Sequence, residues 1–539
     1  MDLETNPPLK PCDSIDQAAL DAHDLATLGH DQVLSRKFSL GSMLALGFCV
    51  LGTWGTFAQD LATGLESGGP VGILWGLVLV TICNLCVALS LGELCSSMPT
   101  ALGQAYWVYR LWNTPTGRFA SYMCAWINTF GWWTLTASAV AFMTNFLLGT
   151  KVMFDNSWAG ASEGWVQFIL YVGVTAMLIV ANLVSCRSDK TLPIFNNIIG
   201  IWFAGLFIVM SIVMVVCVAT QADLSFQPAR FVFSGWINQT GWSDGVTWFI
   251  GLVQAAYGLT AFDSVIHLAE EIPAPRKNVP KTIYLSVISG AITGFIFMVI
   301  CLYCIQDLDQ VLDSPTGLPF MELITSTVGL KGGLVLMVLF IGNGLGQAVS
   351  IMTTSSRLTW GFARDGGLPW SQYFTHVDTT WKMPVRALWL QGLLIALVGV
   401  LYFGVDTVLQ AILSVSTIAL TISYCIPILS LLLVGRDKLP PGEFRLGGLG
   451  PIINWISVVY CVVTTVFFFF PDSPTPSASD MNYAIAVFGV MIIIAVGFWI
   501  FKGHRTYLKS EDSLNAVINA RCEEETIEPV YEQKKGSRI

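Results

Sequence analysis

One carboxylate, Asp263, lies in a part of the chain that is otherwise almost free of charge. It follows the segment 257–262, which reads YGLTAF, and His267 comes four residues later on the same face of a helix. If this segment crosses a membrane, the carboxylate costs about 2.5–3.5 kcal/mol and should face a cavity and a partner. A cationic amine is the partner we expect, while a proton carrier and an acceptor for a neighbouring helix stay open. His267 fits a gate, a proton relay or a packing histidine.

Two glycine-containing segments also carry aromatic side chains. Residues 52–56 read GTWGT, and Gly258 interrupts the apolar segment before Asp263. Glycine lowers helix propensity by about 1 kcal/mol, so a helix unwinds easily at both places. The faces of Trp54, Tyr257 and Phe262 could hold an ammonium group there by cation–π attraction, worth about 2 kcal/mol when desolvated. Close packing between helices is the alternative role of the glycines.

The elements that must position these groups are long apolar helices. The chain has 539 residues, of which 54% are hydrophobic and only 12% are charged. A soluble domain carries about twice that charged fraction. Twelve stretches of about 18 residues or more contain no Asp, Glu, Lys or Arg, and each can cross a bilayer as a helix. They are 38–59, 67–92, 119–150, 164–186, 191–222, 245–262, 282–306, 332–356, 387–405, 407–435, 446–471 and 481–501.

The distribution of basic residues predicts the orientation of these helices. An even number of spans puts both termini on one side, and only three of the 27 Lys and Arg residues, Lys151, Arg230 and Lys331, then fall on the other side. The positive-inside rule makes the terminal side cytoplasmic. The sequon at Asn238 lies in an outer loop and predicts glycosylation. We expect a multi-pass protein of the plasma membrane.

The two glycine-containing segments fall in the first and sixth spans, at corresponding positions of two consecutive five-helix halves. Interrupted helices at matched positions mark the binding site in transporters built from inverted repeats. The acidic, apolar-poor ends are expected to be disordered. The predicted division is a cytoplasmic tail at 1–36, a ten-helix transport core at 37–435, two additional helices at 436–501 and a second cytoplasmic tail at 502–539.

Other functions find little support in the sequence. The pairs Cys83/Cys86 and Cys301/Cys304 lie inside apolar stretches without a nearby His, which favours packing over zinc. No phosphate-binding GxxxxGK[ST] segment occurs, and the five His are dispersed. A channel would need rings of like residues or a repeated filter. We therefore expect no enzyme, no metal, no cofactor and no nucleic-acid partner, while a non-transporting nutrient sensor stays open.

Four segments resemble a known family. They are GTWGT at 52–56, GELCSSMPTALGQAYW at 92–107, AAYGLTAFDSVIHLAEEIPAPRKNVP at 255–280 and SSRLTWGFARDGGLP at 355–369. The chain resembles the amino acid–polyamine–organocation (APC) superfamily, in particular its fungal amino acid/choline permeases. The resemblance implies an all-α integral membrane protein of 12 transmembrane helices, a 5+5 inverted repeat with broken helices 1 and 6 plus two extra helices.

The resemblance also implies roles for individual residues. The expected substrate contacts are Gly52, Thr53, Trp54, Gly55, Tyr257, Gly258, Phe262 and Asp263. The expected gating residues are Glu93, His267, Glu270, Glu271, Arg276 and Arg364.

These expectations combine into one function. We expect a secondary active transporter of a small nitrogenous organic solute, choline or an amino acid such as GABA, driven by a coupling proton. Its partners would be a cationic or zwitterionic substrate, the proton and membrane lipid. Trp54 stands where such transporters often have a small residue, which favours an amine without a carboxylate. A specialised nitrogenous metabolite such as an alkaloid is the alternative cargo.

Overall fold

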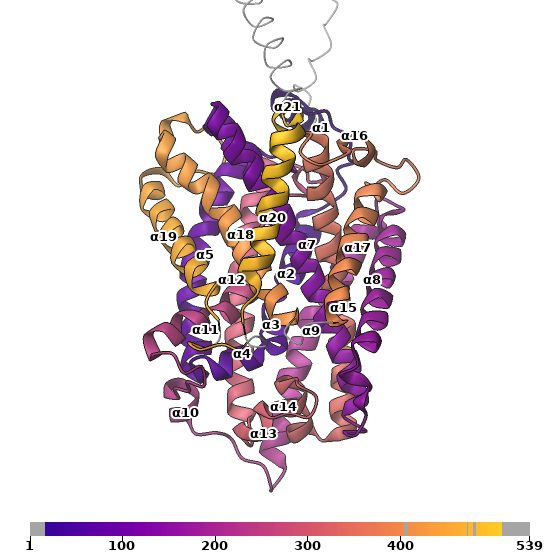
Figure 1. Ribbon diagram of the computed structural model, residues 1–539, viewed down its shortest axis with the longest axis vertical. Coiled ribbons are helices and arrows are strands. Elements are labelled where there is room, and N and C mark those ends of the chain that lie inside the picture. Colours follow the sequence, from indigo (N-terminus) through magenta and orange to yellow (C-terminus); the bar gives the residue numbers. More distant parts are fainter. Residues whose placement is uncertain (1–16, 404–407, 472, 478–480, 509–539) are drawn as a thin grey trace, which may run out of the picture.

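The computed structural model describes residues 17–403, 408–471, 473–477 and 481–508, which form a bundle of long helices (Figure 1). Twelve helical segments in this part of the chain are long and apolar enough to cross a membrane, so the predicted number of spans is confirmed. The long helices are α2 (Leu40–Leu51) with α3 (Thr53–Gln59), α5 (Gly69–Ser97), α7 (Pro115–Val152), α8 (Gly164–Cys186), α9 (Thr191–Thr220), α11 (Asp244–Gly258), α12 (Pro275–Cys304), α15 (Leu330–Arg364), α17 (Val385–Val398), α18 (Val408–Val434), α19 (Gly450–Phe468) and α20 (Ala484–Phe498).

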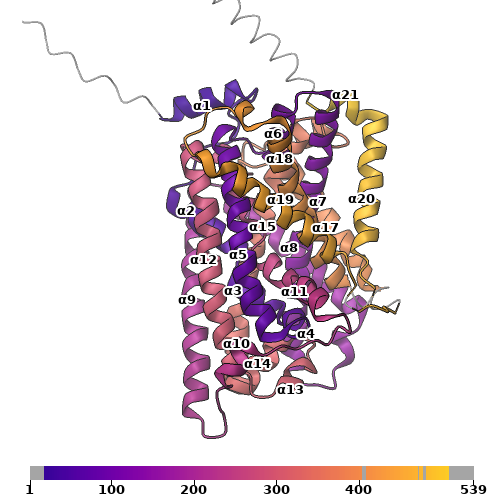
Figure 2. The ribbon, with the colours of Figure 1, turned by 90° about the vertical axis from the view of Figure 1, so that its left-hand side faces the viewer.

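Short helices cover the two ends of the bundle (Figure 2). One end carries α1 (Gln17–Thr27), α6 (Gln104–Leu111), α16 (Ser371–Phe374) and α21 (His504–Thr506), and we call it the α1 end. The opposite end carries α10 (Ala229–Ser234), α13 (Leu308–Leu312) and α14 (Pro319–Val328), and we call it the α13 end. The short α4 (Leu61–Glu66) connects α3 to α5.

The helices divide into a buried centre and an apolar periphery. In α7, 78% of the most apolar window is buried, whereas the corresponding value for α20 is 17%. Peripheral helices present large apolar side chains outward, such as Ile201 on α9 and Ile493 on α20, which are 75% and 72% exposed. An apolar outer surface of this kind requires lipid rather than water around it. The chain is therefore a multi-pass membrane protein.

Both predicted interruptions are present. The first span breaks at Gly52, whose φ of +54° separates α2 from α3. The sixth span breaks after Gly258, where α11 ends, and resumes as a 3-10 helix at Phe262–Val265. Ala261 has a φ of +70° just before this 3-10 helix. The inverted relation between the two halves, and the proposed division of the chain, stay predictions.

The N-terminal segment differs from the expected disordered tail. Helix α1 packs against the bundle, and the Asp21 side chain is only 3% exposed. Its carboxylate accepts the amide of Ala274 at 2.9 Å and lies 3.6 Å from the guanidinium of Arg36. Charged residues thus order this segment through paired contacts, which composition alone does not reveal. The remaining predicted tail residues, 1–16 and 509–539, lie outside the described residues.

Candidate functional site

A small cavity lies between the two helix interruptions. Its volume is about 20 Å³, room for roughly one water molecule. Residues of α2, α3, α7, α11 and α15, with the two residues after Leu259, line it, and none of these described residues is charged. The lining consists of Val50, Leu51, Thr56, Gln59, Leu135, Ala139, Tyr257, Thr260, Ala261, Gln347 and Ile351.

At the first interruption, side chains satisfy the carbonyl groups that the break releases. Gln347 Nε2 donates to the Val50 carbonyl at 3.2 Å, and the Thr56 hydroxyl lies 3.2 Å from the Leu51 carbonyl, to which it donates. A Cβ atom on Gly52 would lie 2.2 Å from Gln347 Nε2. Glycine is therefore required here twice, for its positive φ and for the close approach of α15.

At the second interruption, hydrogen bonds to two other helices, α7 and α18, hold the residues around the break in place. The Tyr257 and Ser138 hydroxyls share a hydrogen bond of 2.8 Å, which ties the end of α11 to α7. The Ala261 amide donates to the Tyr424 hydroxyl of α18 at 3.2 Å. A Cβ on Gly258 would lie 2.3 Å from the ring of Phe57, so the first and sixth spans touch at the breaks themselves.

Asp263 lies beyond the second break and is fully buried. Its Oδ1 accepts the Tyr424 hydroxyl at 2.7 Å, and its Oδ2 accepts Gln104 Nε2 at 2.7 Å. The Trp132 indole nitrogen and His267 Nε2 also lie 3.4 Å and 3.0 Å from Oδ2. The carboxylate is not part of the cavity lining, so its predicted contact with substrate stays a prediction.

His267 lies within hydrogen-bonding distance of Asp263. Its Nδ1 lies 2.9 Å from the Ala101 carbonyl, which can only accept, so Nδ1 carries a hydrogen. Its Nε2 faces the Asp263 carboxyl group at 3.0 Å. A hydrogen bond between these two side chains requires one proton, on the imidazole or on the carboxyl group, because both atoms otherwise only accept. The described residues bring no third His, Cys, Asp or Glu to this pair as metal ligands.

The predicted aromatic contacts are distributed over several places. Only Tyr257 lines the cavity. Trp54 is buried away from it, with ring centroids 5.0 Å from Phe203 and 4.9 Å from Phe297. Phe262 packs on Tyr424 at 4.9 Å. An aromatic cage around an ammonium group is therefore not assembled in this conformation, and the roles of Thr53, Trp54, Gly55 and Phe262 stay predictions.

Buried ion pairs close the bundle at its α1 end. Glu271 pairs with Lys37 at 2.7 Å and with Arg357 at 2.9 Å, and all three side chains are 2% exposed or less. Burial alone would raise the pKa of Glu271, but Lys37 and Arg357 hold this pKa below its usual value. Glu270 pairs with Arg364 at 2.9 Å. These contacts, which we call the α1-end ion pairs, join the residues after α11 to the start of α2 and to α15.

Two more predicted gating residues lie outside this cluster. Glu93 of α5 makes a two-oxygen contact with Arg436 at 2.7 Å. Arg276 pairs with Asp24 of α1 at 2.7 Å and is partly exposed. The predicted glycosylation site, Asn238, lies in the loop between α10 and α11, where its amide donates to the Trp242 carbonyl at 2.8 Å.

Several residues of the site were missed in the sequence. Gln104 and Arg357 lie inside the segments quoted above, 92–107 and 355–369, so their chemistry was available there. Gln347 and Tyr424 had no comparable signal, because they lie in apolar helices far along the chain from the residues that they contact.

Comparisons with known proteins give a family and several relatives of this chain. Residues 38–497 match the family described as "Amino acid permease". A choline transporter of Saccharomyces cerevisiae is 29% identical over 98% of this chain and 91% of its own length. A GABA-specific permease of the same yeast is 27% identical over 92% of this chain and 87% of its own length. An amino-acid permease of Arabidopsis thaliana is 25% identical over 90% of this chain and 95% of its own length.

Proposed function

The chain belongs to the amino acid permease family, and from this premise we propose that its solute binds between the interrupted first and sixth spans. It is a secondary transporter of small nitrogenous solutes and not an enzyme. The observation that carries the proposal is the cavity of about 20 Å³ between the two breaks. Because this space is smaller than any such solute, binding must move the surrounding half-helices apart.

The polarity of the half-helices favours a cationic amine at this place. Helices α2 and α11 both end with their carboxyl termini beside the cavity. Each carboxyl terminus carries roughly half a negative charge, and no charged side chain of the described lining competes with it. Gln347 Nε2 now contacts the Val50 carbonyl. A solute ammonium group would replace that amide, with the Tyr257 ring beside it.

Choline is the first candidate on these grounds, and GABA is the second. Choline has no carboxylate, so the two helix carboxyl ends satisfy its only charge. GABA would also need a partner for its carboxylate, and the described cavity lining contains no cationic side chain. A specialised amine such as an alkaloid would use the same charge pattern and a larger opening.

The shared proton of Asp263 and His267 is our candidate for the coupling proton. The pair lies next to the second break, and the Tyr424 hydroxyl contacts both Asp263 and the Ala261 amide. Loss of the proton would leave one net negative charge in a buried site, which is costly. Protonation and the shape of the second break are therefore linked through Tyr424.

The distribution of Lys and Arg supports a cytoplasmic α1 end. In this orientation the α1-end ion pairs close the path to the cytoplasm, and the loop with Asn238 lies on the outer face, where a glycan would be attached. We place the transporter in the plasma membrane and its net flux inward.

Uptake into proteoliposomes tests the proposal. Purified full-length protein is given labelled choline, GABA, spermidine or amino acids, with and without an inside-alkaline pH gradient. Saturable choline uptake that the gradient increases is the expected result. Binding of a solute without uptake of any would instead identify a sensor.

Two matched variants test the site itself. Gln347→Ala removes the amide beside the first break and should change the KM for choline about fivefold, which corresponds to about 1 kcal/mol of attraction between the quaternary ammonium and the helix carboxyl end. Gln391→Ala removes a buried amide that contacts Thr136 outside the cavity, and its KM should stay unchanged. Equal KM values in the two variants would contradict the proposed binding site. Uptake that does not respond to the pH gradient would contradict proton coupling but not the site.

A further inference from the structure

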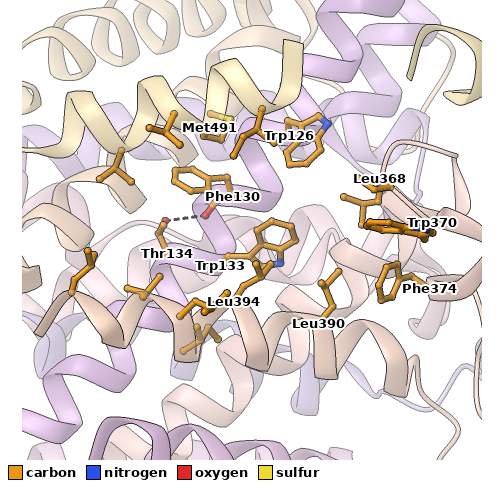
Figure 3. A pocket seen from close by; sticks show the side chains of 18 residues that line it. Trp126, Phe130, Trp133, Thr134, Leu368, Trp370, Phe374, Leu390, Leu394 and Met491 are labelled. Atoms are coloured by element: carbon orange, nitrogen blue, oxygen red, sulfur yellow. Dashed lines mark hydrogen bonds between the residues drawn. The ribbon is translucent and has the colours of Figure 1, made fainter. Parts of the chain in front are cut away.

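An apolar groove runs along the outside of the bundle, away from the cavity between the breaks (Figure 3). Helices α7, α17 and α20 form its walls, and its volume is about 610 Å³. Trp126, Phe130 and Trp133 of α7 form its floor between Met491 of α20 and Leu394 of α17. Apart from Thr134 and the indole nitrogens, its described side chains offer no polar group.

A basic pocket continues this groove at the α1 end. Its volume is about 640 Å³, and it shares Leu368 and Trp370 with the groove. Arg364, Lys502 and Arg505 line it, and its described lining contains no Asp or Glu. Figure 3 shows Trp370 at the end of the groove where the two meet.

One of the three cations has a hydrogen-bonding group to spare. Arg364 Nη1 contacts Glu270, and its Nε contacts Asp365, but its buried Nη2 has no hydrogen-bond partner among the described residues. A buried guanidinium nitrogen without a partner costs free energy unless a ligand or water satisfies it. The pocket also offers the hydroxyls of Ser371 and Thr375.

We propose that the groove and the basic pocket form one binding site for an anionic diacyl phospholipid. An acyl chain lies along the groove, and the phosphate lies among Arg364, Lys502 and Arg505. The groove lining on the ninth span extends from Leu390 of α17 to Leu401 of the 3-10 helix that follows it (Gly399–Phe403), roughly 17 Å of helix, which is about the hydrocarbon depth of one leaflet. Cationic pockets between helices at the cytoplasmic surface are suited to anionic headgroups, and the proposed orientation puts this pocket there.

The charge pattern favours lipid over other occupants. A second copy of the chain could cover the apolar groove but would bring no anion to the three cations. The acidic C-terminal sequence, with Glu523, Glu524 and Glu525, could neutralise the cations, but its many charged residues do not suit an apolar groove. A phospholipid has both parts, an apolar chain and an attached anion.

The proposed lipid site shares one residue with the ion pairs that close the α1 end. Arg364 pairs with Glu270 among the α1-end ion pairs and lines the basic pocket. A phosphate on its free Nη2 would hold the guanidinium in place without displacing Glu270. Bound lipid therefore stabilises the closed α1 end.

The test measures lipid binding to detergent-solubilised full-length protein by native mass spectrometry. Dioleoyl phosphatidylserine is compared with dioleoyl phosphatidylethanolamine and with the soluble headgroup glycerophosphoserine. Phosphatidylserine should be retained and the other two should not. Equal retention of both lipids, or equal binding of the soluble headgroup, would overturn the proposal.

Two pairs of variants locate the site. Lys502→Gln/Arg505→Gln should weaken phosphatidylserine binding roughly thirtyfold, whereas Lys438→Gln/Arg445→Gln, two exposed cations between α18 and α19, should not change it. Val490→Trp fills the groove and should abolish retention, whereas Ile493→Trp on the outward face of α20 should not.

Two outcomes would assign the site to another occupant and overturn the proposal. One is a dimer that Val490→Trp alone dissociates. The other is phosphatidylserine binding that appears only in E523Q/E524Q/E525Q.

Discussion

The Tyr424 hydroxyl donates a hydrogen bond of 2.7 Å to Asp263 Oδ1, and through the same oxygen it accepts the Ala261 amide at 3.2 Å. Ala261 has a left-handed φ of +70°, which costs a non-glycine residue about 1–2 kcal/mol. One hydroxyl of α18 thus connects the buried carboxyl group to the strained residue of the second break. We regard this connection as the element that fixes the shape of the sixth span.

Tyr424→Phe should destabilise the protein and lower transport. The change leaves a buried carboxyl oxygen and a buried amide each short of one partner, at a cost of about 1–3 kcal/mol apiece. Thermal unfolding in detergent should occur at lower temperature, and choline uptake per folded molecule should fall. Tyr402→Phe is the control, since the Tyr402 hydroxyl has no hydrogen-bond partner among the described residues. Equal unfolding temperatures in the two variants would rule out the role of Tyr424.

Gly52→Ala should abolish uptake, while Gly55→Ala should preserve it. At position 52 a methyl group meets both a φ of +54° and Gln347 Nε2 at 2.2 Å. At position 55 the nearest atom, on the ring of Phe340, is 3.7 Å away, an ordinary contact. Uptake normalised to the amount of folded protein separates the two cases. Full activity of Gly52→Ala would mean that transport does not depend on this break.

The sequence predicted the spans and both breaks because these follow from local properties. Charge-free length gives a membrane helix, and glycine at mid-span gives an interruption. Asp263 was identified as unusual for the same reason. Its partners could not be identified, because Tyr424 lies 161 positions away and Gln104 lies 159 positions away.

Helix rotation was the other quantity that the sequence did not provide. Trp54 is next to the first break, which made it a natural candidate for the substrate site. Its side chain instead points toward α9 and α12, where Phe203 and Phe297 surround it. In a helix that is apolar on every face, no periodic pattern distinguishes the side toward the cavity from the side toward neighbouring helices.

Glu270→Gln should open the α1 end more often. The variant removes the charge that Arg364 pairs with, and loss of one partner from a buried ion pair is strongly destabilising. Cys186, 1% exposed beside Arg357, reports the opening through its reaction with a membrane-permeant maleimide, located by mass spectrometry. Labelling should become roughly tenfold faster or more.

Asp189→Asn is the control for that experiment. Its ion pair with Lys382 lies at the same end but is exposed, with side chains 41% and 45% accessible, so it contributes little. A rise in Cys186 labelling of equal size in both variants would show that the Glu270 contact does not hold the closed state.

The pH dependence of stability should report on Asp365. Burial raises the pKa of Asp365 to about 6, although Arg364 acts in the opposite direction and the nearby Glu270 adds to the rise. In the unfolded chain this pKa is about 3.9, so the folded protein binds the proton more tightly. The resulting stability is present below about pH 4 and is lost as pH rises through 6.

Asp365→Asn tests this sign directly. The amide does not titrate. The unfolding temperature of the variant minus that of the parent protein should therefore be higher at pH 7.5 than at pH 4.5. His30, whose Nδ1 lies 3.9 Å from Asp365, has its pKa lowered by burial and by Arg364, which favours its neutral form. A difference that is the same at both pH values would contradict the assignment.

The two halves of the first span, α2 and α3, are held by different kinds of contact, because aromatic rings surround Trp54 of α3. Helix α3 is anchored by rings from α9, α12 and α15, whereas polar contacts with Glu271 hold the far end of α2, namely the Lys37 ion pair and the backbone amides of Lys37 and Phe38. The 12 residues of α2 form a lever about 18 Å long that pivots at Gly52. A swing of about 20° would carry its tip roughly 6 Å, enough to part these polar contacts, whereas Phe48, near the pivot, would move far less against Phe203.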